Sequence, residues 1–212
     1  RPDQDAAGVQ DVDYSLTTRE LGSLISEAGI DFVNLPEMPY DSPLGDYTGA
    51  GVIFGATGGV MEAALRTAVE TITGEELECV EFTDVRGVEG VKEASYNVGG
   101  LEVNVAVASG LANAKKVLDA IRSGEKKYTF VEIMECPGGC VIVDSSVRNF
   151  VDVRALRAKG LYELDKNKPL RKSHENPEII ELYKSYFGEP GSEKAHHILH
   201  TKYVERKVNK DF

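Results

Sequence analysis

The stretch LEVNVAVASGLANAKKVLDAIRSGEKKYTFVEIMECPGGCV, residues 101–141, decides the fold. Residues 101–109 alternate apolar and polar side chains, which is the pattern of a β-strand, and residues 128–134 are apolar almost throughout, as in a central strand covered on both faces. Residues 110–124, which lie between them, are predicted to form a helix. A strand, a helix and a second strand in this order predict a parallel pair, so we expect an α/β domain.

Two helices are predicted on the N-terminal side of this unit. Thr17 and Glu20 have the spacing of a capping box, which predicts the start of a helix, and Gly29 is a typical stop. The glycines at residues 58–59 predict the start of a second helix, which we expect to end near Gly74.

The remaining elements predict one lobe with an extension. Residues 79–85 and 93–98 are predicted to be further strands. After about residue 150 the chain becomes helical, charged and punctuated by Pro and Gly, which favours short helices packed over the same domain. We therefore predict an α/β fold, with a parallel-sheet lobe flanked by helices at residues 1–150 and a helical C-terminal extension at residues 151–212.

The composition excludes several classes of function. The 212 residues are 42% hydrophobic and 28% charged, as in a soluble globular protein with a real core. A net charge of −11 argues against a nucleic-acid partner. The chain contains no apolar run long enough for a membrane span, and its polar first residues predict no signal peptide. Its three cysteines do not make a disulfide framework, so we expect a reducing compartment.

The motif with the clearest chemistry is CPGGC, residues 136–140, at the end of the second predicted strand. Cys136 and Cys140 could bind zinc, ligate an iron–sulfur cluster, form a redox disulfide or lie buried as plain thiols. Structural zinc needs a second ligand pair, and thioredoxin-type disulfides have two intervening residues. Pro137 after a cysteine recurs in cluster-binding runs, and Gly138 and Gly139 let the backbone approach a bulky cofactor. The motif favours an iron–sulfur site and leaves the other three open.

Longer blocks of sequence point to a family. The C-terminal half of the catalytic domain of iron-only (di-iron) hydrogenases resembles this chain in four blocks, TGAGVIFGATGGVMEAALRTA, EFTDVRGVEGVKEA, GLANAKKVLDAI and VEIMECPGGCV. The tail of that family resembles the blocks VDVRALRAKGLYELDKN, RKSHENP and GEPGSEKAHHILHTKY. The resemblance covers essentially the whole chain.

The resemblance implies a cofactor and roles for three residues. The family interconverts dihydrogen with protons and electrons at an H-cluster, a 4Fe–4S cubane joined by a cysteine sulfur to a di-iron subcluster with carbonyl, cyanide and azadithiolate ligands. By this resemblance Cys136 is a cubane ligand, and Cys140 is a cubane ligand that also bridges to the di-iron subcluster. Met134 would lie against the di-iron subcluster, where a soft thioether suits the pocket. Without the resemblance, Met134 would be interpreted as a core methionine.

The resemblance also implies partners and a location. The other two cubane cysteines of the family precede the position where Arg1 stands, so we expect an upstream lobe to supply them and this chain to be inactive alone. Electrons would come from a ferredoxin or from ferredoxin-like clusters of the parent chain, in the cytoplasm of an anaerobic prokaryote. The alternative is a non-catalytic hydrogenase-like iron–sulfur protein that serves in cluster assembly or sensing.

Two departures from the family pattern bear on the alternative. Glu135 stands where the family has alanine, which puts a carboxylate beside the cysteine turn. The glycine-rich stretch that follows CPGGC in the family is missing after Val141. If the protein lacks this stretch, the backbone around a cluster is altered. If the stretch is a disordered loop that is only left out of the sequence, the mechanism is unchanged.

Four other features are given structural interpretations. The segment GATGG, residues 55–59, could cradle an anion, but close helix packing near the cluster cavity is favoured. His196 and His200 could share a metal, but tail packing is favoured. His174 is expected to pack the tail down, and Cys79 is expected to be an ordinary buried cysteine in a strand.

Overall fold

A computed structural model describes residues 9–10, 12–42, 45–142 and 153–200, and the chain divides into two compact units at residues 1–41 and 42–212. The first unit contains α1 (Thr18–Glu27) and a short 3-10 helix, η2 (Phe32–Asn34). The capping box is confirmed, because the Thr17 hydroxyl accepts the Glu20 N–H and the Glu20 carboxylate accepts the Thr17 N–H. Gly29, at φ 68°, follows the helix end as predicted.

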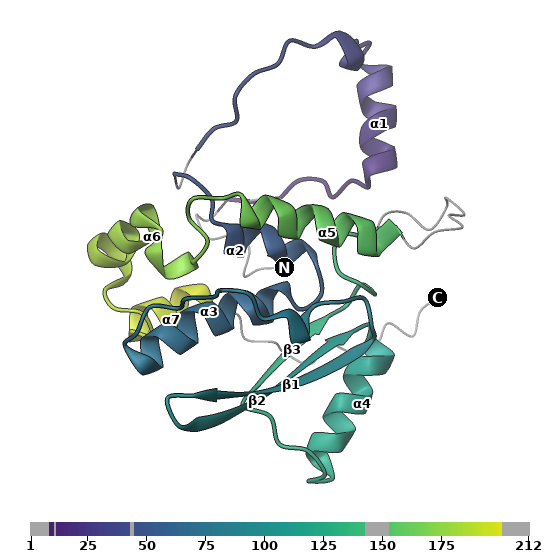
Figure 1. The fold of residues 1–212 in the computed structure, drawn as a ribbon. Helices are drawn as coiled ribbons and strands as arrows, with labels where there is room; N and C mark the ends of the chain where they lie inside the picture. Colours follow the sequence, from purple (N-terminus) through teal and green to yellow (C-terminus); the bar gives the residue numbers. More distant parts are fainter. Residues whose placement is uncertain (1–8, 11, 43–44, 143–152, 201–212) are drawn as a thin grey trace. The chain divides into compact units, whose positions relative to one another are not determined.

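The second unit is built on a three-stranded mixed sheet of order β1-β2-β3 (Figure 1). β1 (Val91–Val98) and β2 (Leu101–Ser109) form an antiparallel hairpin, and β2 runs parallel to β3 (Phe130–Met134). The helix α4 (Leu111–Arg122) connects the parallel pair. The predicted strand–helix–strand unit and the α/β fold are therefore confirmed.

Two strand predictions are wrong. The central strand is β2, whereas β3 lies at an edge of the described sheet, with Phe130 44% and Ile133 45% exposed. Residues 79–85 form no strand and end in a 3-10 helix, η4 (Thr83–Val85). The reason is that their backbone is bonded by side chains of the preceding helix, since Arg66 Nε donates to Val80 O at 2.8 Å.

One helix covers each face of the sheet. α3 (Gly59–Thr73) begins after Gly58 and ends at Gly74, as predicted, and its apolar side packs on β2 in the larger core cluster, formed by Met61, Leu65, Val85, Val105 and Val107. On the opposite face, α4 packs through Val117 against two alanines of β2. The central strand, β2, is thus covered on both faces.

The C-terminal segment is helical, as predicted. It contains α5 (Val153–Lys166), the 3-10 helix η5 (Ser173–Glu175), α6 (Pro177–Leu182), the π-helix η6 (Tyr183–Phe187) and α7 (Glu193–Leu199). α5 packs against the short helices α2 (Gly49–Val52) and η3 (Ile53–Gly55). The predicted boundary near residue 150 lies outside the described residues and stays a prediction. Among the helices described, none is long and apolar enough to cross a membrane.

Candidate functional site

The CPGGC turn, residues 136–140, directly follows the carboxyl end of β3. At the same edge β2 ends at Ser109 and α4 begins, and Gly110 N donates to Met134 O at 2.8 Å. Ligands of open α/β sheets bind at this edge, where the loops that follow parallel strands meet. The position of the turn agrees with the sequence prediction.

The turn exposes both cysteines and buries both glycines. Cys136 and Cys140 are free, exposed thiols, whereas Gly138 and Gly139 are buried. The two glycines adopt φ values of 91° and 97°, which other residues reach only with strain. Gly139 N closes the turn by donating to Cys136 O at 3.0 Å. Met134, half-buried at the end of β3, precedes the turn.

The turn rests on residues 55–59, called here the seat. Thr57 N donates to Gly138 O, and Val141 N donates to Gly55 O, both at 3.1 Å. A Cβ added to Gly139 would lie 2.7 Å from Gly55 O and from Thr57 N. The glycine is therefore needed for close packing of the turn on its own chain, a reason that differs from the expected approach of a cofactor.

A carboxylate fills the anion cradle that the glycines of the seat suggest. Gly58 N and Met61 N, at the start of α3, donate to the two carboxylate oxygens of Glu132, each at 2.7 Å. Glu132 is buried, and its strand, β3, carries the cysteine turn at its end. The helix terminus is therefore occupied by the protein itself, and the preferred interpretation of the seat as a packing element agrees with these contacts.

A buried lysine bonds the seat from the other edge of the sheet. Lys92 Nζ, on β1, donates to Thr57 O at 2.9 Å and to Gly87 O at 2.8 Å. Burial lowers the pKa of Lys92 to about 8, against the opposing attraction of Glu132 and Glu89. Sequence reasoning missed Lys92 and Glu132, although a lone carboxylate in the apolar run FVEIM was a usable signal.

Comparisons with known proteins identify the family of this chain. A family model described as iron only hydrogenase large subunit, C-terminal domain, matches residues 1–142, and one described as iron hydrogenase small subunit matches residues 151–206. The chain belongs to the iron-only hydrogenase family. The cofactor of this family is the H-cluster, a 4Fe–4S cubane with a di-iron subcluster.

The similar proteins are longer than this chain and include both hydrogenases and iron-sulfur assembly proteins. The NADP-reducing hydrogenase subunit HndD of Solidesulfovibrio fructosivorans is 50% identical over 98% of this chain, and Iron hydrogenase 1 of Clostridium pasteurianum is 44% identical over 96%. The chain spans 36% of the length of each, about a third. A more distant relative, cytosolic iron-sulfur assembly component 3 of Rattus norvegicus, is 26% identical over 94% of the chain and 43% of its own length.

A solved structure shows the same fold. An FeFe-hydrogenase variant of Chlamydomonas reinhardtii is 42% identical, with a TM-score of 0.67 over 91% of this chain and 56% of its own. The expected resemblance and the fold class are confirmed by this match and by the family models.

In this chain, a buried arginine cluster joins the C-terminal segment to α3. It comprises Glu62, Arg66, Arg86, Asp165 and Arg171. The guanidinium of Arg66, fully buried, donates twice to Asp165 at 2.8 Å and once to Glu62 at 2.7 Å. Burial opposes ionisation of Asp165, but the hydrogen bonds from Arg66 and Arg171 hold its pKa below the usual value. The i, i+4 spacing of Glu62 and Arg66 on the predicted helix was a usable signal, whereas no local pattern links Arg66 to Asp165.

His174 packs the tail onto α3, as predicted. Its Nδ1 lies 3.0 Å from the Thr67 hydroxyl, and its Nε2 lies 2.7 Å from a carboxylate oxygen of Glu70. Glu70, His174 and Glu175 lie close enough together to suggest a metal site. However, Lys172 Nζ lies 2.8 Å from Glu70 and 2.7 Å from Glu175, so an ammonium group already pairs with both carboxylates of this cluster.

The remaining candidates carry no chemistry of their own. The rings of His196 and His200 are neighbours, and no third ligand joins them within the part of the chain described. Cys79 is exposed, so its expected burial is wrong, because it lies in the loop before η4 and not in a strand. Glu135 is also exposed and carries no burial cost in this chain. The position where the family has its glycine-rich stretch lies within residues 143–152, outside the described residues.

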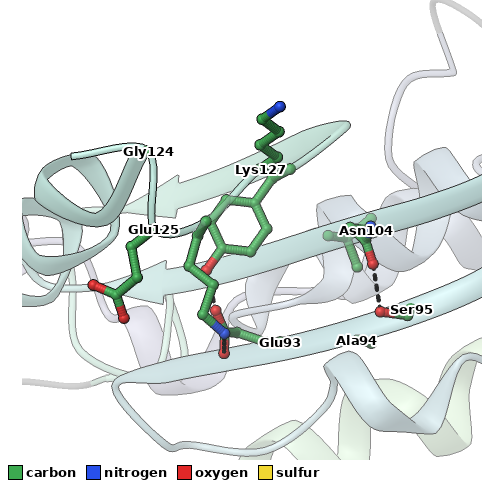
Figure 2. A pocket seen from close by; sticks show the side chains of 10 residues that line it. Glu93, Ala94, Ser95, Asn104, Gly124, Glu125 and Lys127 are labelled. Atoms are coloured by element: carbon green, nitrogen blue, oxygen red, sulfur yellow. Dashed lines mark hydrogen bonds and ion pairs between the residues drawn. The ribbon is translucent and has the colours of Figure 1, made fainter. Parts of the chain in front are cut away.

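A polar pocket of about 580 Å³ lies away from the turn, where β1 and β2 meet the loop before β3. Figure 2 shows Ser95 bonded to Asn104, and the Lys127 side chain pointing away from the Glu93 carboxylate. Glu93 accepts hydrogen bonds from Lys126 and Tyr128. No cysteine lines this pocket, so it is separate from the proposed cluster site. Its exposed ion pair, Lys126 with Glu93, serves below as a comparison for the buried charges.

Proposed function

We propose that this chain supplies two of the four cysteine ligands of the H-cluster cubane, Cys136 and Cys140, in an enzyme that interconverts dihydrogen with two protons and two electrons. The observation that supports it is the pair of exposed thiols on one glycine turn, fixed by backbone hydrogen bonds to the seat. In this proposal Cys140 also bridges to the di-iron subcluster.

The residues present fit such a cofactor. Thiolates are the ligands that hold iron–sulfur clusters, and both thiols here face outward from a backbone that cannot easily move. When bound, the cluster supplies the electron storage and the iron site for hydrogen chemistry. The chain's own part is to hold two ligands at a fixed separation, because Gly138 and Gly139 let the turn close against the seat.

Met134 and Pro137 complete the proposed cofactor-binding surface. Met134 presents a soft thioether at the end of β3, which suits the side of a di-iron subcluster. Pro137 is exposed between the cysteine and the buried glycines, and its ring restricts the backbone at the start of the turn.

The other cubane ligands belong, in this proposal, to an upstream lobe of the same catalytic domain. Electrons pass to or from a ferredoxin or comparable carrier. Three cysteines without a disulfide support a reducing compartment, and we propose the cytoplasm of an anaerobic organism. Alone, the chain is expected to be inactive.

Serine variants of each cysteine test the ligand assignment. In the full-length protein, Cys136→Ser and Cys140→Ser should each abolish hydrogen turnover and the paramagnetic signal of the cubane. Cys79→Ser is the matched control, because Cys79 is also an exposed free thiol and lies away from the turn. A cubane signal of wild-type intensity in either turn variant would refute the assignment.

The second candidate is a non-catalytic iron–sulfur protein of cluster assembly or sensing. The 26% identical assembly component supports it, as does the unusual Glu135. Infrared spectroscopy separates the two functions, because carbonyl and cyanide bands belong to the di-iron subcluster alone. A cubane signal without those bands, after treatment with the maturation enzymes, would favour the second candidate.

A further inference from the structure

Two buried side chains of opposite charge hold one peptide group of the seat. The carbonyl of Thr57 accepts from Lys92 Nζ at 2.9 Å, and the amide of Gly58, in the same peptide group, donates to Glu132 Oε1 at 2.7 Å. Lys92 is 8% exposed and Glu132 is 6% exposed. Because cation, carbonyl, amide and carboxylate follow one another in line, each hydrogen bond polarises the next.

The two charges come from opposite edges of the sheet. Lys92 lies on β1 and Glu132 on β3, with β2 between them, and each charge has one further backbone partner, Gly87 O for the lysine and Met61 N for the glutamate. A Cβ on Gly58 would lie 1.9 Å from Val85 O, so only glycine fits at this position. The arrangement fixes the start of α3 to both edge strands.

Thr57 connects this arrangement to the cysteines. Its carbonyl binds Lys92, and its N–H donates to Gly138 O, between Cys136 and Cys140. We propose that Lys92 and Glu132 are positioning residues of the cofactor site, which hold the seat under the cysteine turn and set the reduction potential of a cubane bound there. The inference rests on the proposed function of the turn.

Charge, and not only shape, is needed to explain the pair. Burying two charged groups carries a large desolvation cost, and neutral amides or hydroxyls could anchor the same backbone atoms. A fixed cation two hydrogen bonds from the turn stabilises an electron added to a cluster there, and a fixed anion opposes it. The two side chains should therefore shift a cluster potential in opposite directions.

The test is a redox titration of the cubane in the full-length protein, reconstituted with iron and sulfide and followed by electron paramagnetic resonance. Lys92→Met should lower the ratio of reduced to oxidised cubane about tenfold at a given potential, which corresponds to a shift of ~59 mV to lower potential for one electron. Glu132→Gln, which keeps an acceptor oxygen, should shift the potential upward.

The exposed ion pair of Lys126 and Glu93 provides matched controls. Lys126→Met and Glu93→Gln remove the same two kinds of charge from an exposed ion pair between the loop before β3 and strand β1, away from the turn (Figure 2). Neither should move the potential. Lys92→Arg retains the cation and should keep the wild-type potential even where Lys92→Met fails to assemble a cubane.

The possible outcomes separate this inference from the function on which it rests. Shifts of the same sign in Lys92→Met and Glu132→Gln, unchanged potentials in both, or a lowered potential in Lys92→Arg would overturn the role of the two charges. A wild-type protein that binds no cubane would instead refute the proposed function.

Discussion

Two groups of buried charges lie along α3, and they differ in what they bind. At the N-terminal end of the helix, Lys92 and Glu132 bind backbone atoms of the seat and of the first turn of α3. One turn later the arginine cluster begins, where Arg66 binds the carboxylates of Glu62 and Asp165. A charge bonded to backbone positions the chain, whereas the removal of a charge bonded to other charges takes a buried partner away from them.

The largest loss of stability is therefore expected in the arginine cluster, away from the cysteines. Arg66→Met removes the buried partner that Asp165 and Glu62 share and leaves each with one partly exposed arginine, so we expect a loss of about 3 kcal/mol in the free energy of unfolding, at the lower end for breaking a buried ion pair. Arg86→Met is the control with a smaller effect, because Arg86 is 20% exposed and Glu62 keeps Arg66. Chemical denaturation of both variants measures the difference. Equal losses would contradict the distinction.

A second variant separates close packing from backbone strain at the turn. Gly139→Ala strains a residue at φ 97° and places a Cβ against the seat, and we expect a loss of about 1–3 kcal/mol and of bound iron. Gly124→Ala strains a residue at φ 76° with open space around it, so it should cost less and leave the iron content unchanged. Iron retained in Gly139→Ala would show that the seat does not position the cysteines.

Some elements of the fold were predictable from the sequence and others were not. The capping box of Thr17 and Glu20, the limits of α3 at Gly58 and Gly74, and the unit β2–α4–β3 were predictable, because their signals are local. The edge position of β3 and the non-strand form of residues 79–85 were not, because they depend on partners distant in sequence.

The candidate site also has a part that the sequence predicts and a part that it does not. The cysteine turn was predictable from the CPGGC motif and the family blocks, including its place at the end of a strand. The joint action of Lys92 and Glu132 was not predictable, since they are 40 positions apart in the sequence and meet only through the peptide group of Thr57 and Gly58. Only the folded sheet brings its two edges to the same loop.

A pH dependence is expected where the tail meets α3. Burial opposes the shift, but hydrogen bonds from Leu77 N, Lys172 and His174 lower the pKa of Glu70 to about 2 from its usual 4.5. A depressed pKa gives stability that is present above pH 4.5 and is lost as the pH falls toward 2. Glu70→Gln should cost roughly 1–2 kcal/mol at pH 6 and progressively less at pH 4 and pH 3.

Denaturant midpoints at these three pH values measure the narrowing gap between Glu70→Gln and the wild type. Glu76→Gln is the control, because Glu76 is 87% exposed and lies 3.9 Å from the same lysine, Lys172. A gap that stays constant with pH would mean that the Glu70 carboxylate is not selectively stabilised in the folded state.

The smallest effect is expected at the solvated pair beside the polar pocket. Lys126 and Glu93 lie 3.1 Å apart with side chains 46% and 42% exposed, so water screens their attraction and both side chains lose freedom when they meet. Lys126→Met should therefore change the free energy of unfolding by less than about 0.5 kcal/mol, and the change should shrink further in high salt. Chemical denaturation at two salt concentrations measures both. An effect as large as that of Arg66→Met would show that burial does not decide how much a charge pair contributes in this fold.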